Sequence, residues 1–108
     1  MLALHALADP TRQRIVEMLA VRELSAGDIA GKFDMSAPAI SQHLKVLKDA
    51  RLVRVRADAQ RRIYALDPEG FEEVDEWLSH IRRFWKGKLD LLERALKADD
   101  RKAGRKKS

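Results

Sequence analysis

The spacing of apolar residues changes twice along the chain. Apolar residues recur every three or four positions up to residue 50, alternate with polar residues over 52–66, and return to the helical spacing from residue 71 onward. The first and third patterns predict helices and the second predicts two short strands. The expected order is therefore α-α-α-α-β-β-α, a mainly α fold with a small β-hairpin.

Two closely spaced capping signals divide the second half of the first helical region. Ser25 can accept a hydrogen bond from an N-terminal backbone N–H, and Asp28, three residues on, occupies the acidic position of a capping box. We expect this helix to run to about Lys32, with Phe33 to Met35 as the turn. Ser36 is the next N-cap, so a second helix follows at once.

The helix that begins after Ser36 has one apolar stripe and one polar face. Ile40, Leu44 and Leu47 fall on the stripe and should be buried, whereas Gln42 lies on the polar face. A short-chained polar face suits a major groove, where Gln can pair bidentately with adenine. His43 lies beside the stripe, so burial and a phosphate contact are equal alternatives. The residues predicted to contact DNA from this helix are Ser36, Pro38, Ala39, Ser41, Gln42, His43, Lys45 and Lys48.

The alternating segment predicts a hairpin whose turn is Asp58-Ala59-Gln60. We expect its solvent face to carry four arginines. Cations on an exposed edge can also serve only to discourage aggregation. Directly after a helix-turn-helix, however, a cationic hairpin favours a wing that contacts phosphate or the minor groove. The predicted wing residues are Arg54, Arg56, Arg61, Arg62 and Tyr64.

Apolar residues outside the helix pair predict a dimer. A helix of about 30 residues should begin at Asp67-Pro68, and its apolar stripe is widened on a second flank, which is more apolar surface than one small domain can cover. A short helix at the N-terminus is also apolar. Packing of this surface within one protomer is the alternative. The predicted interface comprises Leu2, Leu4, Leu7, Val74, Trp77, Leu78, Ile81, Phe84, Trp85, Leu89 and Leu92.

Charge is concentrated where a polyanion would bind. The chain of 108 residues has a net charge of +5, and residues 32–62 hold eight Lys or Arg against three acids. Residues 101–108 hold five bases and no acid, whereas 67–76 hold six acids. We expect one domain at 1–97 that binds DNA and dimerises, followed by a basic disordered tail at 98–108 that either adds DNA affinity or only solubilises the chain.

Several functional classes are excluded or disfavoured. No segment approaches a membrane span and the first residues lack the features of a signal peptide, so we expect a cytoplasmic protein without membrane contact. The chain has no cysteine, and Ser41 and His43 point about 200° apart on a helix, which rules out a nucleophile–base pair between them. An enzyme is therefore not expected, and no cofactor is predicted.

The motifs at residues 7–19, 24–30 and 35–53, above all Ser41-Gln-His-Leu44 followed by Leu52-Val53, resemble the ArsR/SmtB family of bacterial repressors. The resemblance extends over residues 2 to about 97. It implies a winged helix-turn-helix homodimer that is built through its first and last helices and binds a palindromic DNA operator.

The chain departs from the metal-sensing pattern of that family. The positions that hold cysteine ligands in thiolate sensors of the family are Ser25 and Gly27 in this chain. Of the four positions of the interfacial zinc site, only Asp75 is retained, because the other three are Trp77, Lys88 and Leu91. We therefore expect no metal site. An apolar effector bound among the aromatic residues of the last helix is an alternative to simple packing there.

Two functions remain after these exclusions. The first is a sequence-specific transcriptional regulator, a homodimeric and self-regulating repressor. The alternative is a winged-helix module that coats DNA without sequence preference or docks another protein. Salt dependence and preference between duplexes distinguish the two.

Overall fold

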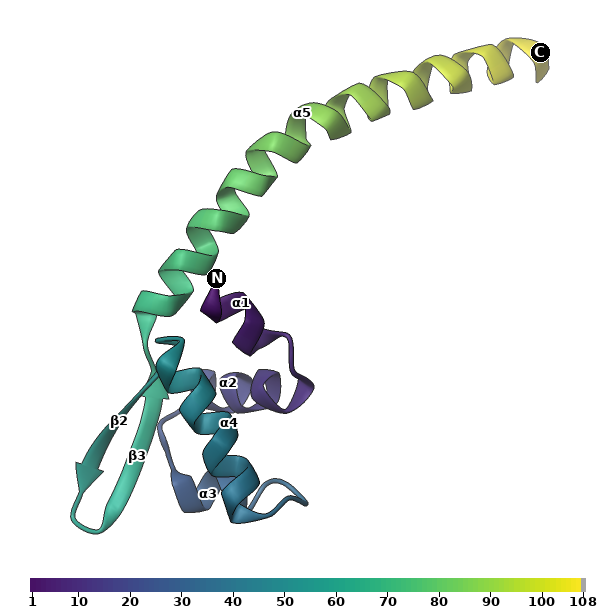
Figure 1. The fold of residues 1–108 in the computed structure, drawn as a ribbon. Helices are drawn as coiled ribbons and strands as arrows, with labels where there is room; N and C mark the ends of the chain where they lie inside the picture. Colours follow the sequence, from purple (N-terminus) through teal and green to yellow (C-terminus); the bar gives the residue numbers. More distant parts are fainter. Residues whose placement is uncertain (108) are drawn as a thin grey trace. The chain divides into compact units, whose positions relative to one another are not determined.

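The computed structural model describes the backbone of residues 1–107 and the side chains of residues 1–99. Five helices and three strands follow the expected order, with one additional strand (Figure 1). The elements are α1 (Leu2–Leu7), α2 (Pro10–Val21), β1 (Leu24–Ser25), α3 (Ala26–Ala30), α4 (Ala37–Asp49), β2 (Val53–Asp58), β3 (Arg61–Leu66) and α5 (Pro68–Lys107). The mainly α winged-helix fold class is confirmed.

Side-chain caps begin α2, α3 and α4, and those of α3 and α4 lie where the sequence predicts them. Asp9 accepts from the backbone N–H of Arg12 at 3.0 Å, and Ser36 accepts from that of Ala39 at 3.3 Å. Ser25 and Asp28 form the full capping box. The predicted end of α3 at about Lys32 is wrong: the helix ends at Ala30 and Gly31 is its C-cap, because Lys32 N–H already bonds back to Ile29 in a tighter turn.

These caps make the stability of the fold depend on pH. The backbone N–H of Arg12 lowers the pKa of Asp9, and the hydrogen bond from Ser25 lowers the pKa of Asp28. A carboxyl group whose pKa is lower in the folded than in the unfolded chain stabilises the fold while it is ionised. This contribution is lost as pH falls through the folded-state pKa, below about pH 4. We expect Asp9→Asn, which keeps a capping oxygen, to flatten this acid limb with little loss at pH 7. Urea titrations between pH 2.5 and 7 measure it, and an acid limb as steep as that of the wild type would contradict it.

The strand β1 was not predicted from the sequence. It pairs antiparallel with β3, with Leu24 opposite Tyr64 and Ser25 opposite Ile63, so the sheet order is β1-β3-β2. Two residues are too few to show an alternating pattern, and their strand conformation comes from pairing with β3. This pairing places the capping box of α3 beside the hairpin.

The hairpin register separates the arginines onto two faces. Arg54 lies opposite Ala65 and Arg56 lies opposite Ile63, whereas Arg62 lies opposite Ala57. Neighbouring residues of one strand point to opposite faces. The expectation of one solvent face for all four arginines is therefore wrong. Arg54, Arg56 and Arg61 share one face, and Arg62 shares the other with Tyr64.

The core of residues 1–74 is built from one face of each element. The predicted stripe of α4 is confirmed, because Ile40, Leu44 and Leu47 are almost fully buried. The largest fully buried side chains are Ile15, Ile29, Ile40, Leu44, Leu47, Leu52 and Val53. Since α4 packs against α1, α2, α3 and β2, its polar face is fixed relative to the hairpin.

A tight junction joins the end of α4 to the start of α5. Leu52 N–H bonds to the carbonyl of Leu47 and Arg51 N–H to that of Lys48, which is a Schellman motif with Arg51 in the left-handed region at φ 59°. The N–H of Gly70 then donates to the carbonyl of Arg51 at 2.8 Å. A Cβ on Gly70 would lie 2.5 Å from that oxygen, so only glycine fits here.

Helix α5 is longer than predicted, with 40 residues rather than about 30. Residues 1–74 form one compact unit and the part of α5 from Asp75 onward is a second unit. The side chains of residues 100–108 lie outside the described part, so the disordered tail at 98–108 and the domain limit at 97 stay predictions, although the backbone of α5 is helical through Lys107. Within the described residues, no helix is long and apolar enough to cross a membrane.

The residues predicted for a dimer interface have different environments. Val74 is buried in the core of residues 1–74, Leu4 and Leu7 are half-buried against that core, and Leu2 is exposed. On α5, Ile81 is half-buried. The exposed apolar residues there are Trp77, Leu78, Phe84, Trp85, Leu89, Leu91, Leu92 and Leu96.

Candidate nucleic-acid interface

The outward face of α4 is polar and exposed. Ser41 and Gln42 lie side by side in the sequence on this face, and Lys45 and Lys48 follow toward the C-terminus. Ala39 and His43 are half-buried on one flank of the helix. Hydrogen-bonding groups thus come first and cations later, which matches a helix whose N-terminal half reads base edges and whose later turns approach phosphates.

Lys45 is paired within the helix. Its ammonium lies 2.8 Å from Asp49, four residues on, and this hydrogen bond raises the pKa of Lys45. Both side chains are exposed, so the pair contributes little to stability. Asp49 partly neutralises Lys45, and Lys48 is left as the stronger cation on this side of α4.

A groove separates α4 from the hairpin. Its cavity of about 270 Å³ has a floor that includes Leu44 and Tyr64, and cations stand along its sides. Tyr64 is only 8% exposed and belongs to the core, so it lies at the base of the groove and not at the tip of the hairpin. The residues lining the groove are Ser41, Leu44, Lys45, Lys48, Val55, Arg62 and Tyr64.

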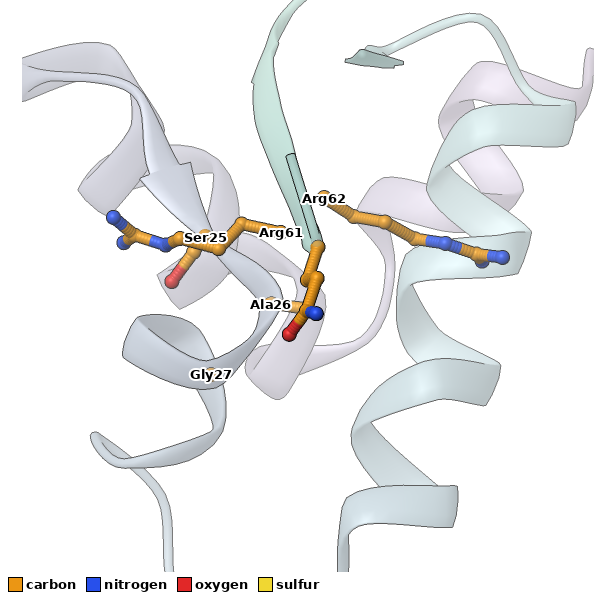
Figure 2. Close-up of a pocket in the computed structure, with 6 residues that line it drawn as sticks. Ser25, Ala26, Gly27, Arg61 and Arg62 are labelled. Carbon is orange, nitrogen blue, oxygen red and sulfur yellow. The ribbon is translucent and has the colours of Figure 1, made fainter. Parts of the chain in front are cut away.

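Arg61 and Arg62 leave β3 in opposite directions (Figure 2). Arg62 extends toward α4 and lines its groove. Arg61 extends past Ser25 and pairs with Asp28 at 3.3 Å. Successive side chains of β3 point to opposite faces, so of these two arginines only Arg62 lies beside the polar face of α4.

The four wing arginines also differ in their charge partners. Arg56 pairs with Glu23 at 3.0 Å, as Arg61 does with Asp28. Within residues 1–99, no acidic side chain lies within ion-pair distance of Arg54 or Arg62. Arg62 is therefore the wing cation that both faces α4 and keeps its full charge for a polyanion.

A second cavity lies between the start of α3 and the tip of the hairpin (Figure 2). It measures about 380 Å³ and contains the two positions, Ser25 and Gly27, that correspond to metal-binding thiolates in the resemblance above. Ser25 is 6% exposed, and its hydroxyl accepts from Asp28 N–H as the cap of α3. Across residues 1–99, no group of three or more His, Asp or Glu side chains is placed to hold a metal ion. The absence of metal sensing stays a prediction.

Sequence reasoning missed the role of Arg12. Its guanidinium Nη1 lies 3.2 Å from Nδ1 of His43, so α2 and α4 are tied together by these two side chains. The two residues are 31 positions apart, and no periodic pattern connects them. The only indication in the sequence was that Arg12 and His43 both lie in segments that resemble the family, residues 7–19 and 35–53.

The comparisons with known proteins agree with this architecture. The family model described as bacterial regulatory protein, arsR family, matches residues 9–55. The HTH-type transcriptional regulator Rv2034 of Mycobacterium tuberculosis is 49% identical over 83 residues, which cover 77% of this chain and 75% of that protein. The transcriptional repressor SdpR of Bacillus subtilis is 36% identical over 73 residues, covering 68% of this chain and 81% of that protein.

A solved structure has the same fold. The crystal structure of the ArsR family transcriptional regulator RHA00566 superposes with a TM-score of 0.73 at 29% identity, covering 79% of this chain and 88% of that one. The matched residues contain the caps, the helix pair and the start of the hairpin described above. The chain belongs to the ArsR family of bacterial regulatory proteins and is a DNA-binding transcriptional regulator, not an enzyme.

Proposed function

We propose that the protein is a homodimeric repressor that binds a palindromic operator, including one in its own promoter, without sensing a metal. The observation that carries the DNA-binding assignment is the polar face of α4 beside a groove flanked by Lys48 and Arg62, neither of which has an acidic partner within residues 1–99. Because such a protein acts on chromosomal DNA, it acts in the bacterial cytoplasm.

The contacts divide into base reading and backbone holding. Ser41 and Gln42 carry groups that can donate to and accept from base edges, and Gln42 can bind adenine at two atoms. Lys48 and Arg62 carry only charge-assisted donors and suit phosphate oxygens. Ser36 and Pro38 set the start of α4 and stay close to the DNA backbone in this arrangement.

A dimer through α5 is supported by apolar exposure and by charge. From Asp75 to Asp99, most large apolar side chains are exposed, by 41% for Trp77 up to 64% for Leu91. Residues 67–76 hold six acids and no base, and residues 77–89 hold four bases and no acid. In a symmetric antiparallel pair of helices that crosses near residue 79, the acidic stretch of each copy faces the basic stretch of the other, and the apolar residues from Trp77 to Trp85 lie along the contact.

Such a dimer explains why the operator should be an inverted repeat. A two-fold axis presents two α4 helices to one face of the duplex, about 34 Å apart, which is one turn of DNA. The relative SdpR is named as a transcriptional repressor, which supports repression as the outcome of binding here. No cofactor is part of this proposal.

The division of labour predicts different losses from two substitutions. Gln42→Ala should reduce the preference for the operator over other sequences by about 1–3 kcal/mol, because a base contact is lost. Arg62→Ala should weaken binding to all duplexes equally, because a phosphate contact is lost. The slope of the logarithm of affinity against the logarithm of salt concentration should also become less steep by about one. Fluorescence anisotropy on operator and scrambled duplexes at several salt concentrations measures both.

Arg54→Ala is the matched control for the wing, because Arg54 lies on the opposite face of the hairpin and has no acidic partner within the described side chains. It should change affinity less than Arg62→Ala does. Identical behaviour of Gln42→Ala and Arg62→Ala would contradict the division between base reading and phosphate contact. Equal and strongly salt-dependent binding to every duplex would instead favour the coating module.

Regulation by an apolar effector bound near the aromatic residues of α5 is an alternative to simple packing of these residues. Phe84 and Trp85 are exposed and meet edge to face with ring centroids 5.8 Å apart. In the proposed dimer these aromatic side chains would pack at the seam between the two copies. A change of operator affinity on adding lipids or aromatic compounds would establish an effector instead.

A further inference from the structure

Arg12 connects three helices through its side chain. Its Nε donates to the carbonyl of Ala6 in α1 at 2.7 Å, and its Nη1 reaches Nδ1 of His43 in α4 at 3.2 Å. The backbone N–H of the same residue donates to the cap of α2, Asp9. The guanidinium is therefore held on both sides and has little freedom to release His43.

The chemistry of arginine decides which atom of His43 carries the hydrogen. A guanidinium has N–H donors and no acceptor, so Nδ1 of His43 must be the acceptor of this hydrogen bond. The carboxylate of Asp9 is the other charged group facing Nδ1, at 3.9 Å, which is too long for a hydrogen bond. A ring that accepts through Nδ1 carries its hydrogen on Nε2.

The same geometry turns the hydrogen of His43 away from α2. The two ring nitrogens point in different directions, so Nε2 is directed away from the guanidinium that holds Nδ1. His43 follows Gln42 on the flank of α4, and 18% of its side chain is exposed. A donor of fixed direction is thus held next to the residues that face DNA.

We propose that Arg12 is a positioning residue for DNA binding, which fixes His43 in the Nε2–H tautomer so that His43 donates to a phosphate oxygen beside the bases read by Gln42. The proposal rests on the proposed function of the α4 face. A phosphate is the fitting partner because Nε2–H can only donate and phosphate oxygens only accept, at every sequence.

Substitutions at His43 separate the two ring nitrogens. Asn places an acceptor near the position of Nδ1 and has no donor near that of Nε2, whereas Gln reaches the position of Nε2 with its amide N–H. We expect His43→Asn to weaken binding to operator and scrambled duplexes by the same factor, roughly two- to tenfold, because one hydrogen bond is lost at every sequence. His43→Gln should remain closer to the wild type.

A spectroscopic measurement tests the role of Arg12 directly. Long-range ¹H–¹⁵N correlation spectra of the folded protein should show the Nε2–H form of His43 in the wild type. Arg12→Met keeps the aliphatic stem but has no donor, so the spectrum should change to a mixture of tautomers or to a form that donates to Asp9. Gln13→Ala is the matched control, because Gln13 also ties α2 to α1, through the carbonyl of Leu7, and has no contact with His43.

The outcomes distinguish this proposal from the proposed function. A wild-type spectrum showing the Nδ1–H form or a charged ring, or an unchanged spectrum in Arg12→Met, would overturn the role of Arg12. If His43→Asn bound DNA as tightly as the wild type does, the phosphate contact alone would be overturned. If the wild type bound no duplex at all, the proposed function would fail together with the phosphate contact, and the tautomer result would still be read independently.

Discussion

Replacing Gly70 with alanine is expected to destabilise the fold by about 1–3 kcal/mol. A Cβ at this position would lie 2.5 Å from the carbonyl oxygen of Arg51 and 2.8 Å from that of Ala50. Both neighbours are backbone atoms held by the Schellman motif at the end of α4, so neither can move aside without breaking that motif. Chemical denaturation followed by circular dichroism measures the change.

Gly87→Ala is the control for this prediction. Gly87 lies on the same helix, α5, and a Cβ there would meet nothing within 4 Å. Alanine in an open helical position stabilises by up to about 1 kcal/mol relative to glycine. Opposite signs for the two substitutions would support close packing at Gly70. Equal small effects would contradict it.

The second large effect is expected on α5. Trp85→Glu together with Leu89→Glu should convert a dimer into a 12.3 kDa monomer and reduce operator affinity by roughly a hundredfold or more, because each copy then binds one half-site alone. Both side chains are about half exposed within α5, at 49% and 57%, so the substitutions remove apolar surface without opening a core. Light scattering after size exclusion measures the mass, and anisotropy measures the affinity.

Arg94→Glu provides a control with the same change of charge. Each of the two variants makes the net charge more negative by two units, and Arg94 lies about 180° around the helix from Trp85. We expect this control to remain dimeric and to bind the operator nearly as tightly as the wild type. A monomeric wild type at micromolar concentration would contradict the dimer outright.

Capping residues and apolar stripes made most of the fold predictable from the sequence. Ser25 and Ser36 begin helices where their side chains predict, because a cap acts within three residues of itself. The stripe of α4 is buried as its spacing predicts. These features are local, so one sequence was enough to find them.

Predictions from the sequence missed the features that depend on tertiary pairing or placed them wrongly. The strand β1 exists only through β3, and the separation of Arg61 from Arg62 follows from the register of the hairpin. The contact between Arg12 and His43 joins residues far apart in the chain. The candidate site could therefore be proposed from the sequence as a set of residues. The structure was needed to select Arg62 as the wing cation that lies beside α4 and has no acidic partner within residues 1–99.

The most direct test of the proposed function is fluorescence anisotropy of the protein on its own upstream promoter DNA and on a scrambled duplex, at physiological salt, with and without zinc. We expect at least about a thousandfold preference for the promoter duplex, unchanged by zinc. Equal weak binding to both duplexes would contradict a self-regulating repressor, and release or recruitment by stoichiometric zinc would contradict its independence of metals.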